Sequence, residues 1–489
     1  MSILRYTASA DTTITNAFKS DLVLRATGSN MGAADSLEIF SIFAQADTGS
    51  IEKSRALLRF PTDAMATDRT SGDLPASGSV NFFLRLFNAK HPFTVPENIT
   101  LVVHPITASW EEGYGLDMDG YTDLTYDGVG ANWNNRSEDN TWTTAGGEFD
   151  TTKVYEVLLE KGVEDLETDI TDLVEEWLDS SRANNGVGVM LTSSLEDGSA
   201  ERSYYTKKFF ARSSEYFYKR PLIEARWDSS RKDQRGNFYY SSSLASSADN
   251  LNTLYFYNFV RGQLANIPAV GDGNVYVDLF SGSAGVPSGD PLLQSLENGI
   301  VSPATGGLVI GSTGVYSCSV CLTAAVNDSP YTTLYDVWHG GDGGETYFTG
   351  TIKPISLKGK AHNPNPSYVT NITNLKGVYS PKETNTRFRL YTRSKDWCPT
   401  IYTKASKNIE NNIIEDSFYR LYRISDDFDV IPYGTGSTNH TKLSYDISGS
   451  YFDLDMSMLE PGYAYGIKFL FYVNSSYREQ TEVFKFRVE

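Results

Sequence analysis

Cysteine and histidine are both scarce in this sequence. Its 489 residues include three cysteines and five histidines. Three cysteines are too few for a disulfide framework in a chain of this length, and the single Cys318-x-x-Cys321 motif has no second pair to complete a zinc site. Catalysis needs a nucleophile, acid or base with a partner, and no histidine has such a partner nearby in the sequence. The composition therefore predicts that the protein is not an enzyme.

Long apolar runs and basic segments are also lacking. No apolar stretch approaches the length that crosses a membrane, and the N-terminus lacks the apolar core of a secretory signal. The net charge of −19 repels nucleic acids and anionic membranes. We therefore expect synthesis in a cytoplasm, no nucleic-acid binding and no membrane insertion. Acidic residues are densest between Glu138 and Asp179, a pattern typical of a solvated face or of a docking surface.

Aromatic residues, in contrast, are abundant. The chain has 31 tyrosines and 25 phenylalanines, set among Thr, Val, Asn, Gly and Ser. These residue types favour strands and tight turns, so the sequence predicts a mainly β protein. A length of 489 residues, at roughly 150 residues per domain, predicts three domains.

One segment, residues 168–192, has helical rather than strand periodicity. Its apolar residues recur every three or four positions and form the stripe Ile170, Leu173, Val174, Trp177 and Leu178. Thr168 or Asp169 is suited to cap the first turn, and Asn184-Asn185-Gly186 is typical of a helix stop before a buried strand. A short helix is marginal alone. We therefore expect the stripe, with Trp177 as a structural residue, to cap the first β-sandwich.

Turn-rich breaks divide the strand pattern into three β-sandwich domains in tandem. The first spans 1–227, with a turn-rich excursion from 109 to 144. An extended connector at 228–262, rich in Ser, Asn and charge, follows it. Two immunoglobulin- or fibronectin-like sandwiches are then predicted at 263–360 and 361–489.

Several short motifs follow one another in order within residues 1–227. They are ADTTI at 10–14, SRALLRF at 54–60, SWEEG at 109–113, WNN at 133–135 and FFAR at 209–212. This order resembles the DNRLRE-type β-sandwich module named after disaggregatase-related proteins, although Ala211 replaces the family's usual serine. The resemblance implies a jelly-roll-like sandwich, with one capping helix, in which Trp110 and Trp133 are structural residues.

The excursion holds the best candidate for a metal site. Asp117, Asp119 and Asp123 place three carboxylates around a glycine turn, which suits calcium. The spacing departs from the twelve-residue calcium loop, and aspartate and glycine also serve turn geometry alone. Both interpretations stay open, and no other cofactor is expected.

The same excursion suggests two further kinds of chemistry. Tyr114, Tyr121 and Trp142 would form a sugar-stacking platform, as carbohydrate-binding relatives of the DNRLRE module imply, or would serve packing instead. Glu111 and Glu112 would suit glycoside hydrolysis if they formed a catalytic carboxylate pair. Adjacent acids in a loop are common, however, so we do not expect hydrolysis.

The phrases KRPLIEARWDSS at 219–230, LNTLYFYNFVRGQL at 251–264 and YFDLDMSMLEPGY at 451–463 resemble virion structural proteins of marine tailed bacteriophages. That resemblance implies a non-enzymatic component of the tail, neck or head surface, located in the virion and bound to other virion proteins and to its own copies. The alternative is an adhesion protein that binds a surface glycan or receptor. Chain order favours the structural role, because the lectin-like module comes first and no fibrous repeat follows it.

Overall fold

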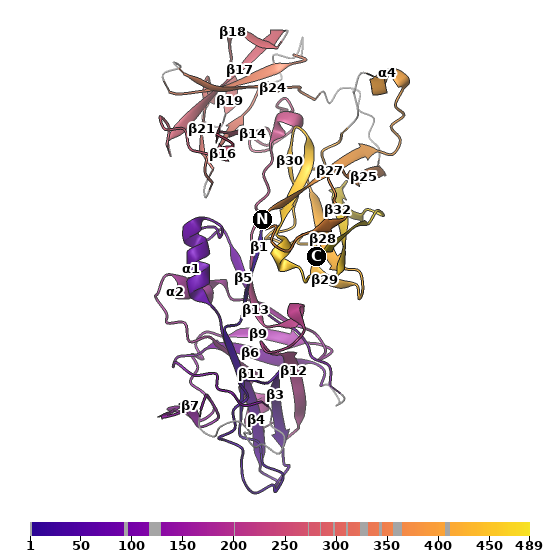
Figure 1. Cartoon of the computed structure of the whole chain (residues 1–489). Helices are drawn as coiled ribbons and strands as arrows, with labels where there is room; N and C mark the ends of the chain where they lie inside the picture. Colours follow the sequence, from indigo (N-terminus) through magenta and orange to yellow (C-terminus); the bar gives the residue numbers. More distant parts are fainter. Residues whose placement is uncertain are drawn as a thin grey trace. The chain divides into compact units, whose positions relative to one another are not determined.

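The computed structural model describes residues 2–91, 96–116, 129–199, 201–271, 273–283, 285–296, 299–309, 312–322, 331–341, 345–355, 364–405 and 411–489. The chain is mainly β and forms tandem β-sandwich domains (Figure 1). It divides into two compact units, Ser2–Trp227 and Asp228–Glu489. None of the helices in the described residues is long and apolar enough to cross a membrane.

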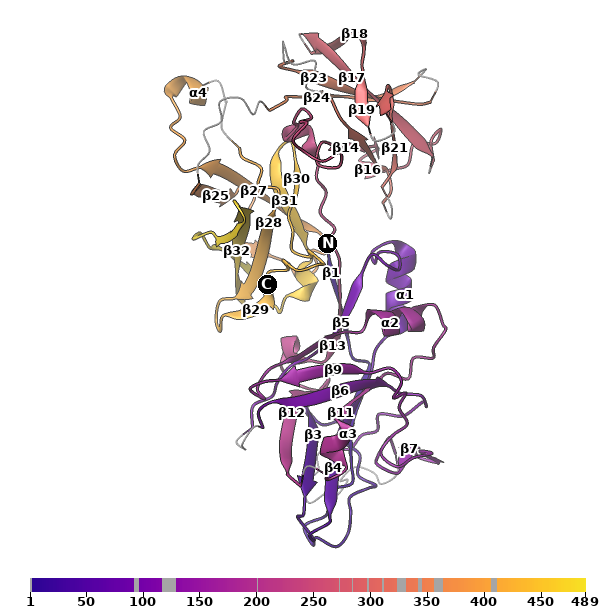
Figure 2. The same ribbon diagram turned by 180° about the vertical axis from the view of Figure 1, so that it is seen from behind.

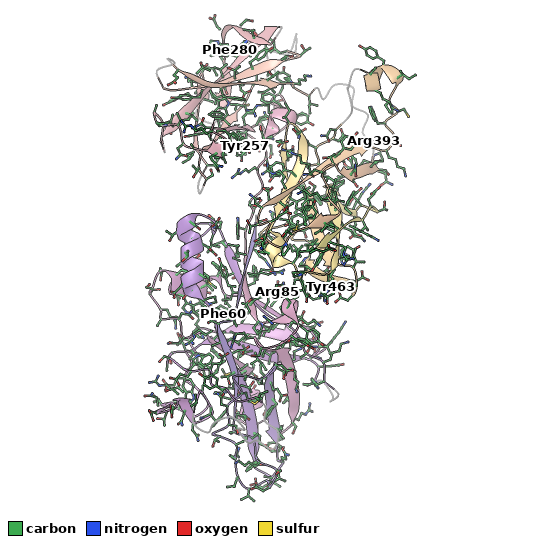
Figure 3. The ribbon with its side chains drawn as sticks, viewed as in Figure 1. Phe60, Arg85, Tyr257, Phe280, Arg393 and Tyr463 are labelled. Carbon is green, nitrogen blue, oxygen red and sulfur yellow. The ribbon has the colours of Figure 1, made fainter. Side chains whose placement is uncertain are left out.

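The N-terminal unit is a sandwich of two sheets (Figure 2). One sheet has the order β1 (Ile3–Thr7), β13 (Leu222–Arg226), β5 (Asn81–Leu86), β10 (Leu166–Asp169). The other has the order β12 (Tyr204–Phe210), β3 (Ser36–Phe43), β4 (Ile51–Arg59), β11 (Val187–Leu191), β6 (Ile99–Pro105), β9 (Tyr155–Leu159), and β2 (Ala10–Thr15) pairs with β4. Inward-facing residues of both sheets, together with Phe60 directly after β4 (Figure 3), form the core. Pairing of β1 with β13 joins the two ends of the unit.

A buried carboxylate ties the four-stranded sheet together. The Glu224 carboxylate on β13 forms ion pairs with Arg226 Nε at 2.6 Å, Arg5 Nε at 2.7 Å and Arg85 Nη1 at 3.3 Å (Arg85 is labelled in Figure 3). Burial alone would raise the pKa of Glu224, but the three guanidinium groups outweigh it and hold that pKa below its usual range. Three strands thus share one ionic network.

The predicted helix is α2 (Thr171–Leu178), and its apolar stripe is buried as expected, with Leu178 at the half-buried edge. Asp169 helps to satisfy the first turn, since its Oδ1 accepts the Thr171 amide at 2.9 Å. The predicted stop at Asn184–Gly186 is wrong, because the helix ends several residues earlier and Ser180 already has a positive φ of 65°. Gly186 serves a different purpose: a Cβ there would lie 1.9 Å from Leu58 O, so only glycine fits beside β4.

A second helix, α1 (Thr62–Ser71), corrects the expectation of a single capping helix. It packs on α2 through a bidentate ion pair, with Arg69 Nη1 and Nη2 at 2.6 and 2.8 Å from the Glu175 carboxylate. Met65 is its one buried residue. Without an apolar stripe, α1 lacks the periodicity from which a helix is predicted. A short third helix, α3 (Ser193–Glu196), follows β11.

Trp177 is central to the α2 stripe, and its buried Nε1 has no hydrogen-bond partner among the described residues. We predict that Trp177→Ala lowers the free energy of unfolding by about 3–5 kcal/mol, whereas Trp177→Phe costs only about 1–2 kcal/mol because no hydrogen bond is lost. Urea unfolding measures both values. The exposed Glu138→Ala is the control, and equal losses in the two Trp177 variants would contradict the packing role.

The second unit begins with a curled seven-stranded sheet. Its order is β14 (Asn252–Tyr257), β22 (Val315–Val320), β21 (Ala304–Leu308), β17 (Asn274–Ser283), β23 (Leu334–His339), β24 (Thr346–Ile352), and β18 (Val286–Leu292) pairs with β17. Phe256 of β14 stacks on Phe348 of β24 with ring centroids 5.3 Å apart, so the two edges face each other. Two hairpins accompany the sheet: β15 (Phe259–Val260) with β16 (Gln263–Leu264), and β19 (Gln294–Leu296) with β20 (Gly299–Val301).

The last β-sandwich has an aromatic core. Its four-stranded sheet is β25 (Tyr368–Ile372), β27 (Thr386–Ser394), β31 (Gly449–Leu454), β30 (Ser444–Asp446). Its six-stranded sheet is β26 (Val378–Tyr379), β34 (Phe484–Val488), β32 (Ala464–Val473), β28 (Ser417–Arg423), β29 (Phe428–Ile431), with β33 (Ser476–Glu479) on β32. Phe388 and Phe452 stack at 5.1 Å as a cross-strand pair of the four-stranded sheet, Phe486 of the other sheet lies 5.9 Å from Phe388, and the short α4 (Ile401–Ala405) lies outside both sheets.

The segment predicted as an extended connector is built into both parts of the second unit. Lys232 forms a parallel bridge with Tyr445 of β30, and Tyr239 forms one with Ile355 after β24. Between them, the 3₁₀ turn η3 (Gln234–Gly236) places Arg235 inside the curled sheet. The connector range also includes β14, β15 and β16. Its composition predicts an extended connector, and in the structure several of its polar residues are buried.

Arg235 is the centre of this attachment. Its Nη2 lies 2.7 Å from Asp336 Oδ2 and its Nη1 lies 2.9 Å from Asp233 Oδ2. Asp336 also accepts Trp338 Nε1 at 2.8 Å. A Cβ at Gly350 of β24 would lie 2.3 Å from Asp336 Oδ1, so glycine leaves room for the pair. A fully buried, hydrogen-bonded ion pair therefore fixes the connector to the sheet.

Breaking one side of this pair leaves a buried charge unpaired. We predict that Arg235→Ala lowers the free energy of unfolding of the second unit by about 3–5 kcal/mol, and that the double variant with Asp336→Asn costs less than the sum of the two single changes. Urea unfolding of the four proteins of the cycle gives the coupling. The exposed Lys382→Ala is the control, and strict additivity would show that the pair does not couple.

Candidate functional site

The loop at 109–116, which carries the SWEEG motif, is organised around one buried amide. Asn30 Nδ2 donates to Glu112 O and to Ala131 O, each at 2.8 Å. Asn30 Oδ1 accepts the amides of Gly32 and Gly115, each at 3.0 Å. All hydrogen-bonding positions of the side chain are thus used to hold two loops against each other.

The glycines of this region are required by the close approach to Asn30. A Cβ at Gly113 would lie 2.3 Å from Asn30 Oδ1, and one at Gly115 would lie 1.7 Å from Asn30 O. Gly113 also has a φ of 79°, which disfavours any other residue. The glycines of the motif are therefore needed for loop packing. No local pattern in the sequence links the motif with Asn30.

Three tryptophans form a second core with the loops on the outer face of the seven-stranded sheet. Trp110 Nε1 donates to Asn185 O at 2.8 Å, and the guanidinium group of Arg55 lies 5.3 Å from the centroid of the Trp133 ring. Trp142 is only 4% exposed and its Nε1 donates to Asn132 O at 2.9 Å. All three are packing residues here, so the ring of Trp142 does not face solvent as a sugar-stacking ring would.

Asp11, Glu112 and Arg212 form a charged cluster beneath the loop. Arg212 Nη2 lies 2.9 Å from both carboxylate oxygens of Glu112, and Glu112 Oε1 also accepts the Asp11 amide at 2.9 Å. Asp11 Oδ2 accepts the Arg212 amide at 2.5 Å. Burial raises the pKa of Asp11 to about 7, and the nearby negative charge of Glu112 adds to the rise.

Two carboxyl groups in environments this different resemble the acid and base of a hydrolase. Here, however, the Glu112 carboxylate is held by Arg212 and by a backbone amide, and Asp11 is buried. Neither group is placed to receive a substrate proton. The cluster fixes the loop 109–116 to β2 and to the segment after β12.

The raised pKa of Asp11 makes stability depend on pH. The folded state binds the Asp11 proton more tightly than the unfolded state. The protonated carboxyl therefore contributes most to the free energy of unfolding below the pKa that Asp11 has in the unfolded chain, and this contribution is lost as pH rises through about 7. We predict that, between about pH 5.5 and about pH 8, the free energy of unfolding of Asp11→Asn rises by about 2 kcal/mol relative to that of the wild type. Urea unfolding at both pH values measures this, and a pH-independent difference would contradict the buried neutral carboxyl.

The remaining predicted site residues fall in two classes. Asp117, Asp119, Asp123 and Tyr121 lie outside the described residues. Tyr114, between Gly113 and Gly115, is 69% exposed. Within the described parts of the chain, no group of three His, Cys, Asp or Glu residues is arranged to hold a metal ion. The calcium and glycan interpretations therefore stay predictions.

One polar cluster in the second unit has no local signature in the sequence. His339 is buried at the end of β23, with Nε2 at 3.1 Å from Asp278 Oδ2 and Nδ1 at 2.7 Å from Gly340 O. Ser302 Oγ donates to the same carboxylate at 2.7 Å. Since the serine donates to aspartate rather than to histidine, the arrangement does not activate a nucleophile. Asp278 and His339 are 61 positions apart in the sequence, so no local pattern predicts the pair.

The cysteines do not form a reactive site either. Cys318 and Cys321 are buried free thiols, and burial raises the pKa of Cys318 to about 12. A thiol that stays protonated is a poor nucleophile and a poor metal ligand. Both side chains therefore act as small core residues.

The comparisons with known proteins add no family assignment. No protein-family model matches this chain, and no curated protein matches it.

Proposed function

We propose that the protein is a non-enzymatic structural component of a tailed-phage virion, in the tail, neck or head surface, and acts through protein–protein docking. The observation that carries the proposal is a division of roles among side chains. Groups that resemble catalytic machinery, such as Glu112 with Asp11 and His339 with Asp278, are committed to internal hydrogen bonds. The phage-like phrases of the C-terminal half support the same role.

Exposed apolar side chains favour docking over catalysis. Phe259 is 61% exposed on the β15–β16 hairpin, Leu158 is 56% exposed on the edge strand β9, and Tyr477 is exposed on β33. Exposed aromatic and aliphatic groups on sheet edges are typical of contact surfaces. The partners proposed are other virion proteins and further copies of this chain.

The second candidate is an adhesion protein that binds a surface glycan. The exposed Tyr114 favours it, because an exposed tyrosine ring suits sugar stacking. The buried Trp142 removes one of the three rings proposed for that platform. The structural role is therefore preferred.

Mass spectrometry of purified virus particles tests the proposal. We expect the protein at a fixed copy number relative to the capsid protein, because a structural part is built in stoichiometrically. Absence from particles would contradict the proposal. Cleavage of polysaccharides by the isolated chain, lost in a Glu111→Gln or Glu112→Gln variant, would replace it with a hydrolase.

A further inference from the structure

The β15–β16 hairpin is a small apolar projection on a rigid base. Phe259 pairs with Leu264 and Val260 pairs with Gln263, and every residue from 259 to 264 is exposed. At the base, Asn258 and Ala265 exchange hydrogen bonds: Ala265 N donates to Asn258 O, and Asn258 Nδ2 donates to Ala265 O at 2.7 Å. The hairpin is thus held in shape while its apolar side chains face solvent.

The turn of the hairpin carries a strained arginine. Arg261 and Gly262 both have positive φ, 52° and 82°, which is the conformation of a two-residue type I′ turn. Asn or Gly would adopt the first of these positions at lower cost. Strain of this kind is typical of functional positions, and here it places a cation between apolar residues at a projecting tip.

A complementary surface lies on β9, the edge strand of the seven-stranded sheet in the N-terminal unit. Tyr155, Val157 and Leu159 face the core, whereas the alternate residues Glu156 and Leu158, and Glu160 next to the strand, are exposed. Neither Glu156 nor Glu160 forms an ion pair among the described residues. The edge therefore offers one exposed leucine between two unneutralised carboxylates.

From these two surfaces we infer that the protein associates head to tail with a second copy of itself: the β15–β16 hairpin of one copy docks on the β9 edge of the next. This rests on the docking function proposed above and names one partner. Phe259 and Leu264 would cover Leu158, and Arg261 would meet Glu156 and Glu160. A sheet edge accepts a further strand pair through its free backbone groups.

The charges also disfavour the symmetric alternative. Pairing of β9 with β9 of another copy would place the carboxylates of Glu156 and Glu160 close to one another, and like charges across paired strands are destabilising. A cationic hairpin meets no such repulsion. The contact is thus heterologous, and a heterologous contact builds rings or filaments rather than closed dimers. Its small apolar area predicts weak, concentration-dependent association that salt weakens further.

Two apolar-to-acid variants of the full chain test the inference. Phe259→Asp removes the hairpin surface and Leu158→Asp removes the edge surface. The control is Leu244→Asp, at a residue that is 97% exposed and belongs to neither surface. Sedimentation velocity over a concentration series measures the mass of each protein, and melting curves check that each is folded. We expect the average mass of the wild type and of the control to rise with concentration. We expect each test variant to associate at least about tenfold more weakly than the wild type.

Mixing the two test variants is the decisive arm. Each variant keeps one intact surface, so an equimolar mixture should form a 1:1 dimer and nothing larger. A monomeric wild type, a mixture without dimer, or a control as weak as the test variants would overturn the inference. If the chain is found in particles but is monomeric alone, the self-association inference is wrong and the proposed function stands. If the chain self-associates but is absent from particles, the proposed function is wrong and the self-association stands.

Discussion

A charge removed from water must be paired, and the fold of this protein depends on that constraint at several points. Glu224 joins three strands of one sheet because arginines from β1, β5 and β13 surround it. Arg235 attaches the connector to the curled sheet through Asp336. Lys207, which is buried, donates to Asn88 Oδ1 and to two backbone carbonyls, and burial lowers its pKa to about 8. Ionic groups here act as cross-links between distant segments.

Local signals in the sequence predicted the local structure well. The α2 stripe repeats with helical period, and strand alternation with an aromatic-rich composition correctly indicated tandem β-sandwiches. Helix α1 was not predicted, because Met65 is its single buried residue and its sequence therefore has no apolar periodicity. The charged composition of the connector predicts an extended segment, and only Asp336, far along the chain, explains why Arg235 is buried.

The candidate site shows the same limit. The SWEEG motif marked a special loop, and the buried Trp110 and Trp133 agree with a structural role. Asn30, which holds that loop, lies 82 residues before Glu112, and no local pattern links the two. The proposed function rests on how these groups are used. Polar side chains that resemble catalytic groups form hydrogen bonds inside the sandwiches, whereas apolar residues such as Phe259 are exposed and could contact partners.

Amide hydrogen exchange, compared between the isolated chain and purified particles of which it is proposed to be a part, tests this division most directly. The account predicts slow exchange near Arg235 and Asn30 in both samples, because internal hydrogen bonds hold these segments with or without partners. It predicts that residues 259–264 and the amides of β9 that do not face β6 exchange faster in the dilute isolated chain than in the particle, where docking protects them. Equal exchange of both surfaces in the two samples, or rapid exchange near Arg235 in the isolated chain, would contradict the account.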